Sequence, residues 1–165
     1  MPVAVPILAG TAIRGLAATV MMRSVLERHP NAFLVTLAHF GLAMPLNSSQ
    51  EHIHKDVQAG LARQDRAPDA PIVLVGHSQG GLAALRYAAD HQDQVRHVIS
   101  VGAPWRGSVS AQRISSLFSW TGRNLTPALS DMAEDSPFLT ALHADVPSIA
   151  DRITNIYSTH ELFIQ

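Results

Sequence analysis

A serine stands at the centre of the run Gly76-His77-Ser78-Gln79-Gly80, directly after an apolar segment at 71–75 and directly before a helical pattern over 79–91. A serine between a strand and a helix occupies a tight turn with strained backbone angles, which presents its hydroxyl at the carboxyl end of the strand. The glycines leave room for that turn, and the helix start directs unpaired amides and its positive dipole end towards the serine. The pattern therefore predicts that Ser78 is a nucleophile in a reaction that develops negative charge. A glycine-rich turn with an incidental serine is the alternative.

Short apolar runs separated by helical patterns predict the elements that carry this turn. The expected strands are 3–8, 32–38, 71–76, 98–101 and 153–157. Helices are expected over 15–28 and over 79–91. A third helix between them is expected to open with a Ser48-x-x-Glu51 capping box and to bury Ile53, Val57 and Leu61. This alternation predicts a doubly wound α/β sheet, in which chemistry gathers at the carboxyl ends of the strands.

The connection before the last expected strand, from 103 to 150, is too long for a plain crossover and predicts an insertion around 104–150. Both tryptophans, Trp105 and Trp120, lie in it with apolar residues between them. We expect this amphipathic segment to form a lid or an acyl-chain wall, with a core-facing helix as the alternative. Further along, Phe138, Leu139 and Leu142 are expected to pack a helix onto the sheet.

Length and composition limit the class of protein. The 165 residues, 47% of them hydrophobic, predict a single domain that spans 1–165. A formal net charge of −1 predicts no nucleic-acid partner and a neutral or apolar small-molecule substrate. The chain has no cysteine, which excludes a thiolate nucleophile and a sulfur-bound zinc site. His52 and His54 point apart on a helix, so we expect no metal site there. No other cofactor is expected.

The first ten residues lack a basic segment ahead of their short apolar stretch, so neither a signal peptide nor stable membrane insertion is expected. A cytoplasmic location is the default expectation, and secretion is the alternative if the N-terminus given is incomplete.

The chain resembles the α/β-hydrolase superfamily, most closely its small bacterial triacylglycerol lipases and esterases. Residues 76–81 resemble the nucleophile elbow, 98–107 the strand and turn that follow it, and 127–145 a segment that often precedes the acid-bearing strand. The resemblance covers nearly the whole chain. It implies an α/β-hydrolase fold with a mostly parallel sheet of about five strands and helices on both faces. It also implies cleavage of a carboxylic ester or lipid through an acyl-enzyme on Ser78.

Three further residues take catalytic positions under this resemblance. The backbone amide of Gln79, next to the nucleophile, is the first oxyanion-hole donor by the rule of the motif. Ala9-Gly10-Thr11 occupies the place of the family's His-Gly-x, which suggests the Thr11 amide as the second donor, although Gly10 could simply end a strand. Glu161 stands where the triad carboxylate follows a late strand, and a solvated surface residue is the alternative.

The general base has no convincing candidate. His77 diverges from Ser78 on the sharp turn, His160 is too close to Glu161 in sequence, and His143 precedes the expected acid. A family histidine would follow the acid, so we expect a fragment that lacks the last strand, the histidine loop and the final helix. An inactive or non-catalytic hydrolase-like module, or a related acyltransferase or thioesterase, remains the alternative function.

Overall fold

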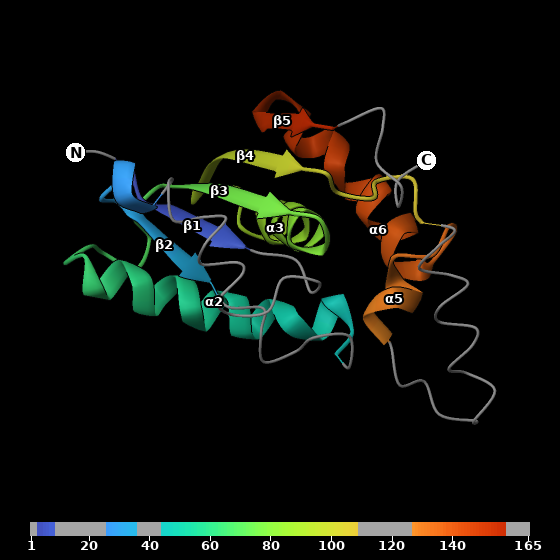
Figure 1. Cartoon of the computed structure of the whole chain (residues 1–165), viewed down its shortest axis with the longest axis horizontal. Coiled ribbons are helices and arrows are strands. Elements are labelled where there is room, and N and C mark those ends of the chain that lie inside the picture. The colour runs from blue at the N-terminus through green and yellow to red at the C-terminus, as the bar shows by residue number, and fades with distance from the viewer. Residues whose placement is uncertain (1–2, 9–25, 36–43, 109–126, 158–165) are drawn as a thin grey trace.

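The computed structural model describes residues 3–8, 26–35, 44–108 and 127–157. In chain order the described elements are β1 (Val5–Leu8), β2 (Ala32–Val35), α2 (Leu46–Arg63), β3 (Ile72–His77), α3 (Gln79–Asp90), β4 (Val95–Val101), α5 (Pro127–Asp131), α6 (Pro137–Asp145), the 3₁₀ helix η2 (Val146–Arg152) and β5 (Ile153–Ile156). The strands form one five-stranded sheet in the order β2-β1-β3-β4-β5, and every described pairing is parallel (Figure 1). The predicted fold class, a parallel α/β sheet of about five strands, is confirmed.

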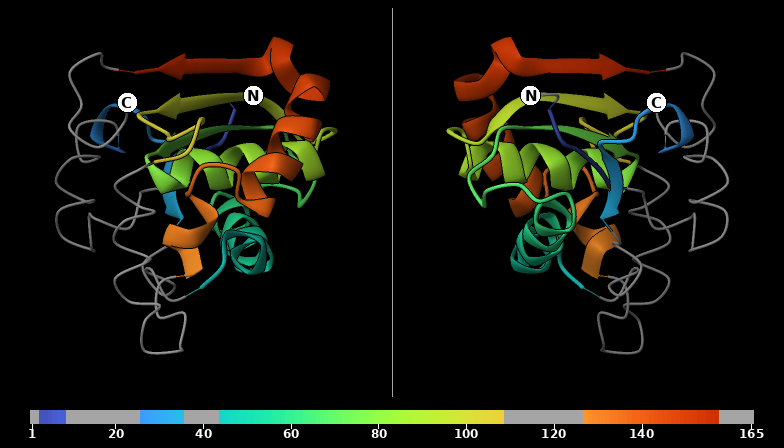
Figure 2. Two further views of the ribbon diagram at one scale, coloured as in Figure 1. Left: turned by 90° about the vertical axis from the view of Figure 1, so that its right-hand side faces the viewer. Right: turned by 90° about the vertical axis from the view of Figure 1, so that its left-hand side faces the viewer.

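Helices α2 and α3 cover the same face of this sheet. A Cβ atom on Gly60 of α2 would lie 2.1 Å from the Phe33 ring of β2, and one on Gly81 of α3 would lie 2.8 Å from Ser100 Oγ of β4. Both views of Figure 2 show α3 below β4 and β5, with α2 below α3. The core lies between these helices and the sheet. The helix expected over 15–28, on which the prediction of helices on both faces depends, lies outside the described residues except for 26–28, which are helical.

The predicted strands appear in the predicted order, with shifted ends. Strand β4 begins at Val95 rather than Val98, because the exposed Arg96 interrupts the apolar run without ending the strand. The described part of β2 ends at Val35, and residues 36–38 lie outside the described segments.

The capping-box prediction for Ser48 and Glu51 is wrong. Helix α2 begins at Leu46 after Pro45, with no side-chain cap from its own N-cap residue. The Leu46 N–H instead donates to Asp131 Oδ2 of α5 over 2.6 Å, 85 residues away in the sequence. A carboxylate from another element thus satisfies the helix start, and Glu51 pairs with Lys55 one turn later. The expected apolar stripe of this helix is confirmed, since Ile53, Val57 and Leu61 are buried.

The described part of the expected insertion packs on α3. Phe138, Leu139 and Leu142 of α6 are buried in the core, as predicted, and Ser136 caps the helix by accepting a hydrogen bond from the Leu139 N–H. Whether residues 104–150 act as a lid stays a prediction, because 109–126 lie outside the described residues.

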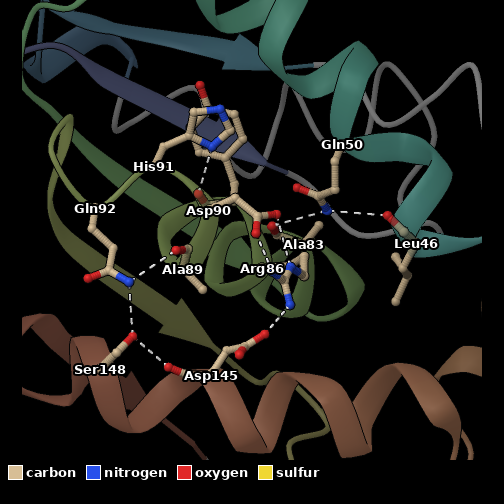
Figure 3. A network of polar contacts seen from close by, with 11 residues as sticks. Leu46, Gln50, Ala83, Arg86, Ala89, Asp90, His91, Gln92, Asp145 and Ser148 are labelled. Carbon is tan, nitrogen blue, oxygen red and sulfur yellow. Dashed lines mark hydrogen bonds and ion pairs between the residues drawn. The ribbon is translucent and has the colours of Figure 1, made fainter.

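Polar contacts join α3 to α6 and η2 (Figure 3). Arg86 of α3 forms ion pairs with Asp90 on its own helix and with Asp145 at the end of α6. Gln92 Nε2 donates to Ser148 Oγ over 3.1 Å, just beyond α3. These contacts attach the segment that leads into β5 to the central helix.

Candidate active site

Ser78 connects β3 to α3 with backbone angles φ 55° and ψ −125°. Positive φ at a residue with a side chain costs about 1–3 kcal/mol and persists only where the surroundings hold it. Two hydrogen bonds do so: the Ser78 N–H donates to Val101 O of β4 over 2.8 Å, and the Gly81 N–H donates to Ser78 O over 2.9 Å. The strained strand-to-helix turn that the sequence motif predicts is therefore present.

Two glycines permit the close approach of α3 to the sheet. A Cβ on Gly76 would lie 2.4 Å from Gly80 O and 2.6 Å from Gly81 Cα, both backbone atoms. A Cβ on Gly81 would lie 2.7 Å from Ala103 Cβ. Any side chain at either position would separate the first turn of α3 from β3 or from the end of β4.

The start of α3 is suited to an anion. Gln79 is its first residue, and no acidic side chain occupies the first turn, so the amides there are not already neutralised by a carboxylate of that turn. The Gln79 side chain is buried, and its Oε1 atom has no hydrogen-bond partner. The role of the Gln79 amide as an oxyanion donor stays a prediction, and Thr11 lies outside the described residues.

The carboxyl ends of β3, β4 and β5 meet at one edge of the sheet. Val101 O accepts a hydrogen bond from Ser78, and the next amide, Gly102 N–H, donates to Ile156 O of β5 over 2.8 Å. The chain after β5 therefore leaves the sheet at the same edge as Ser78, with β4 between them. Glu161 follows five residues after Ile156 but lies outside the described residues, so its role as the acid stays a prediction.

His143 is engaged elsewhere, whereas a ring nitrogen of His77 has no partner. His143 of α6 contacts Trp105 O through Nε2 over 2.6 Å, and the half-buried His77 has an unpartnered Nδ1 atom. Within the described segments, no hydrogen bond joins a histidine to the Ser78 hydroxyl, and the identity of the general base stays a prediction.

A second group of titratable side chains lies towards the other end of α3. The rings of Tyr87 and His91 stack with centroids 4.0 Å apart, and His54 of α2 stacks on His91 at 5.1 Å. His54 Nδ1 also lies 3.0 Å from the Tyr87 hydroxyl. Burial, followed by the neighbouring His91, lowers the pKa of His54, and burial raises the pKa of Tyr87 to about 12. Within the described segments, no three His, Cys, Asp or Glu side chains are arranged to bind a metal ion.

Sequence reasoning missed Ser100 and Ala103, on which the first turn of α3 rests. Small residues at the end of a strand carry no local signal of such a contact. The register of β3 and β4 places Ser100 beside Gly76, and Ala103 follows two residues after the end of β4. None of the described helices is both long and apolar enough to cross a membrane.

Several solved structures share this fold. Lipase B from Aspergillus fumigatus superposes with a TM-score of 0.68 and 19% identity over 99% of this chain and 38% of its own. Phospholipase PlaB from Legionella pneumophila gives a TM-score of 0.67 and 15% identity over 95% of this chain and 38% of its own. The mature lipase BlEst2 from Bacillus licheniformis gives a TM-score of 0.59 and 14% identity over 95% of this chain and 68% of its own. At these identities the likeness establishes the fold alone.

The chain spans well under half the length of the phospholipase and of the fungal lipase. A sequence comparison with curated proteins produced no match. A profile of the alpha/beta hydrolase fold, in contrast, matches residues 38–131, which include β3, Ser78, α3 and β4 and make up more than half of the chain. The chain therefore belongs to the alpha/beta hydrolase fold family.

Proposed function

We propose that the chain carries the nucleophile of a serine hydrolase of the lipase or esterase type, which cleaves carboxylic esters through an acyl-enzyme on Ser78. The observation that carries the proposal is the backbone of Ser78, with φ 55° and ψ −125° between a buried strand and a helix start. A strained serine has no structural purpose in such a turn, since glycine would adopt these angles without penalty. The presence of a serine at these angles favours a chemical role for the hydroxyl.

In the proposed reaction, Ser78 Oγ attacks the ester carbonyl carbon and its proton passes to a general base. The carbonyl oxygen becomes an oxyanion, which the Gln79 and Thr11 amides stabilise, and removing one such donor costs about 2.7–4 kcal/mol of barrier. The tetrahedral intermediate collapses and the alcohol leaves with the proton. Water then attacks the acyl-enzyme by the same steps, releasing the acid and restoring the hydroxyl.

We assign the base to none of the histidines of this chain, and propose that Glu161 orients a histidine that follows it in the full-length protein. The emergence of the chain at the Ser78 edge of the sheet after β5 supports this placement for the acid. The substrate is a neutral ester or lipid, in keeping with the formal net charge of −1.

A non-catalytic module is the second candidate, favoured by the absence of a histidine contact at Ser78 within the described segments. A fluorophosphonate probe, with the adduct located by mass spectrometry, separates the two functions. We expect an adduct on the Ser78 peptide of the folded full-length protein, none in its Ser78→Ala variant, and hydrolysis of a p-nitrophenyl ester that the substitution abolishes. A folded full-length protein that neither labels nor hydrolyses the ester would establish the non-catalytic alternative.

A further inference from the structure

The first turn of α3 rests on two side chains at the carboxyl end of β4. A Cβ on Gly81 would lie 2.8 Å from Ser100 Oγ and 2.7 Å from Ala103 Cβ, so no atom can be added between them. Ser100 also lies directly beside Gly76 in the parallel register of β3 and β4. It therefore occupies the space beneath the turn that carries Ser78.

The Ser100 side chain makes no bond that would explain its presence. It is 0% exposed, and its Oγ atom has no hydrogen-bond partner. An unpaired buried hydroxyl is unfavourable compared with an apolar group of the same size, so the hydroxyl itself does not stabilise the turn. What Ser100 contributes is its small volume.

We propose that Ser100 is a positioning residue, whose volume sets the separation between β4 and the first turn of α3 and thereby the position of Ser78 Oγ. The link to the nucleophile is short, because the Gly81 amide donates to Ser78 O over 2.9 Å. A larger side chain at position 100 pushes Gly81 away from β4 and moves Ser78 with it. The inference rests on the proposed function, since the position of Oγ is tested through its reactivity.

The test changes volume and polarity separately. Ser100→Thr adds one methyl group, Ser100→Val adds volume but removes the hydroxyl, and Ser100→Ala removes the hydroxyl alone. Val98→Ile is the matched control: Val98 is equally buried on the same face of β4, but pairs with Leu74, away from the turn. For each variant, made in the full-length protein, the second-order rate constant of fluorophosphonate labelling is measured well below its melting temperature.

We expect Ser100→Thr and Ser100→Val to label at least tenfold more slowly than wild type, since a displacement of about 1 Å at a reacting atom can cost a hundredfold in rate. Ser100→Ala and Val98→Ile should label within twofold of wild type. The added volume should lower the melting temperature of Val98→Ile, as it does for Ser100→Thr and Ser100→Val, but without slowing the labelling. A purely structural role would instead slow labelling in all the destabilised variants alike.

Labelling of Ser100→Thr and Ser100→Val at the wild-type rate would overturn the inference and leave the proposed function intact. If neither variant folds, Ala103→Ser adds one atom at the second contact and should slow labelling in the same way. If the wild-type full-length protein folds but does not label, the proposed function is overturned, and this inference with it.

Discussion

Replacing Ser78 with glycine should stabilise the protein while removing its proposed activity. With φ 55° and ψ −125°, Ser78 occupies a region that residues with a Cβ rarely adopt, at a cost of about 1–3 kcal/mol. Glycine adopts these angles freely, but ordering its flexible backbone on folding costs about 0.5–1 kcal/mol more free energy than ordering alanine does. The difference leaves a net gain of about 1 kcal/mol in the free energy of unfolding, or roughly 3 °C in melting temperature for a chain of this length.

Ser78→Ala is the matched control. It removes the same hydroxyl but keeps the Cβ, and therefore keeps the strain. Urea unfolding and thermal unfolding, both followed by circular dichroism, should rank Ser78→Gly above wild type, with Ser78→Ala within about 0.5 kcal/mol of wild type. Neither variant should react with a fluorophosphonate. Equal stability of the glycine and alanine variants would refute the reasoning, because it would mean that the turn stores no strain at Ser78.

Three further outcomes are expected. Gly76→Ala should lower the free energy of unfolding by about 1–3 kcal/mol and slow labelling, because its Cβ would lie 2.4 Å from a backbone oxygen of α3; unchanged urea unfolding would contradict this contact. The pKa of His54 is lowered from 6.5 by burial and then by His91, so the unfolded chain binds more protons and stability should fall as the pH drops below about 6.5. Comparing wild type with His54→Gln in urea at pH 7.5 and 5.5 checks this, and an identical loss of stability in both proteins would exclude His54 as its source. Asp131→Ala should lower the free energy of unfolding by about 1 kcal/mol, measured with urea, because it removes the carboxylate that caps α2. Ser48→Ala should lower it by less than about 0.5 kcal/mol. The reverse ranking would mean that Ser48 caps the helix after all.

The elements that can be predicted from the sequence are those specified by neighbouring residues. Buried strands of a parallel sheet form continuous apolar runs, and the 71–76 run therefore predicts β3 within one residue. The turn at Ser78 is equally local, because the glycines that permit it lie within three residues of the serine. Helix α3 follows from the same segment.

What the sequence could not predict depends on contacts between distant segments. The start of α2 is capped by Asp131, 85 residues away, so the local Ser48 pattern led to the wrong boundary. The support of the turn by Ser100 and Ala103 follows from the pairing of β3 with β4, which the sequence pattern does not specify. The proposed acid, Glu161, follows the end of β5, and only the resemblance to the fold family suggested its position.

The strands near the site differ in how deeply they are buried. Holding φ 55° requires rigid neighbours, and the central strand β3 provides them, with Ile72 and Leu74 fully buried and Val101 O of β4 fixing the Ser78 amide. Strand β5 is different, since it lies at the edge and Ile156 is 51% exposed. Less buried apolar surface makes a strand open more readily. The described part of the turn that carries the nucleophile is therefore formed mainly by β3, α3 and β4, whereas we expect the position of the proposed acid to depend on how firmly β5 docks.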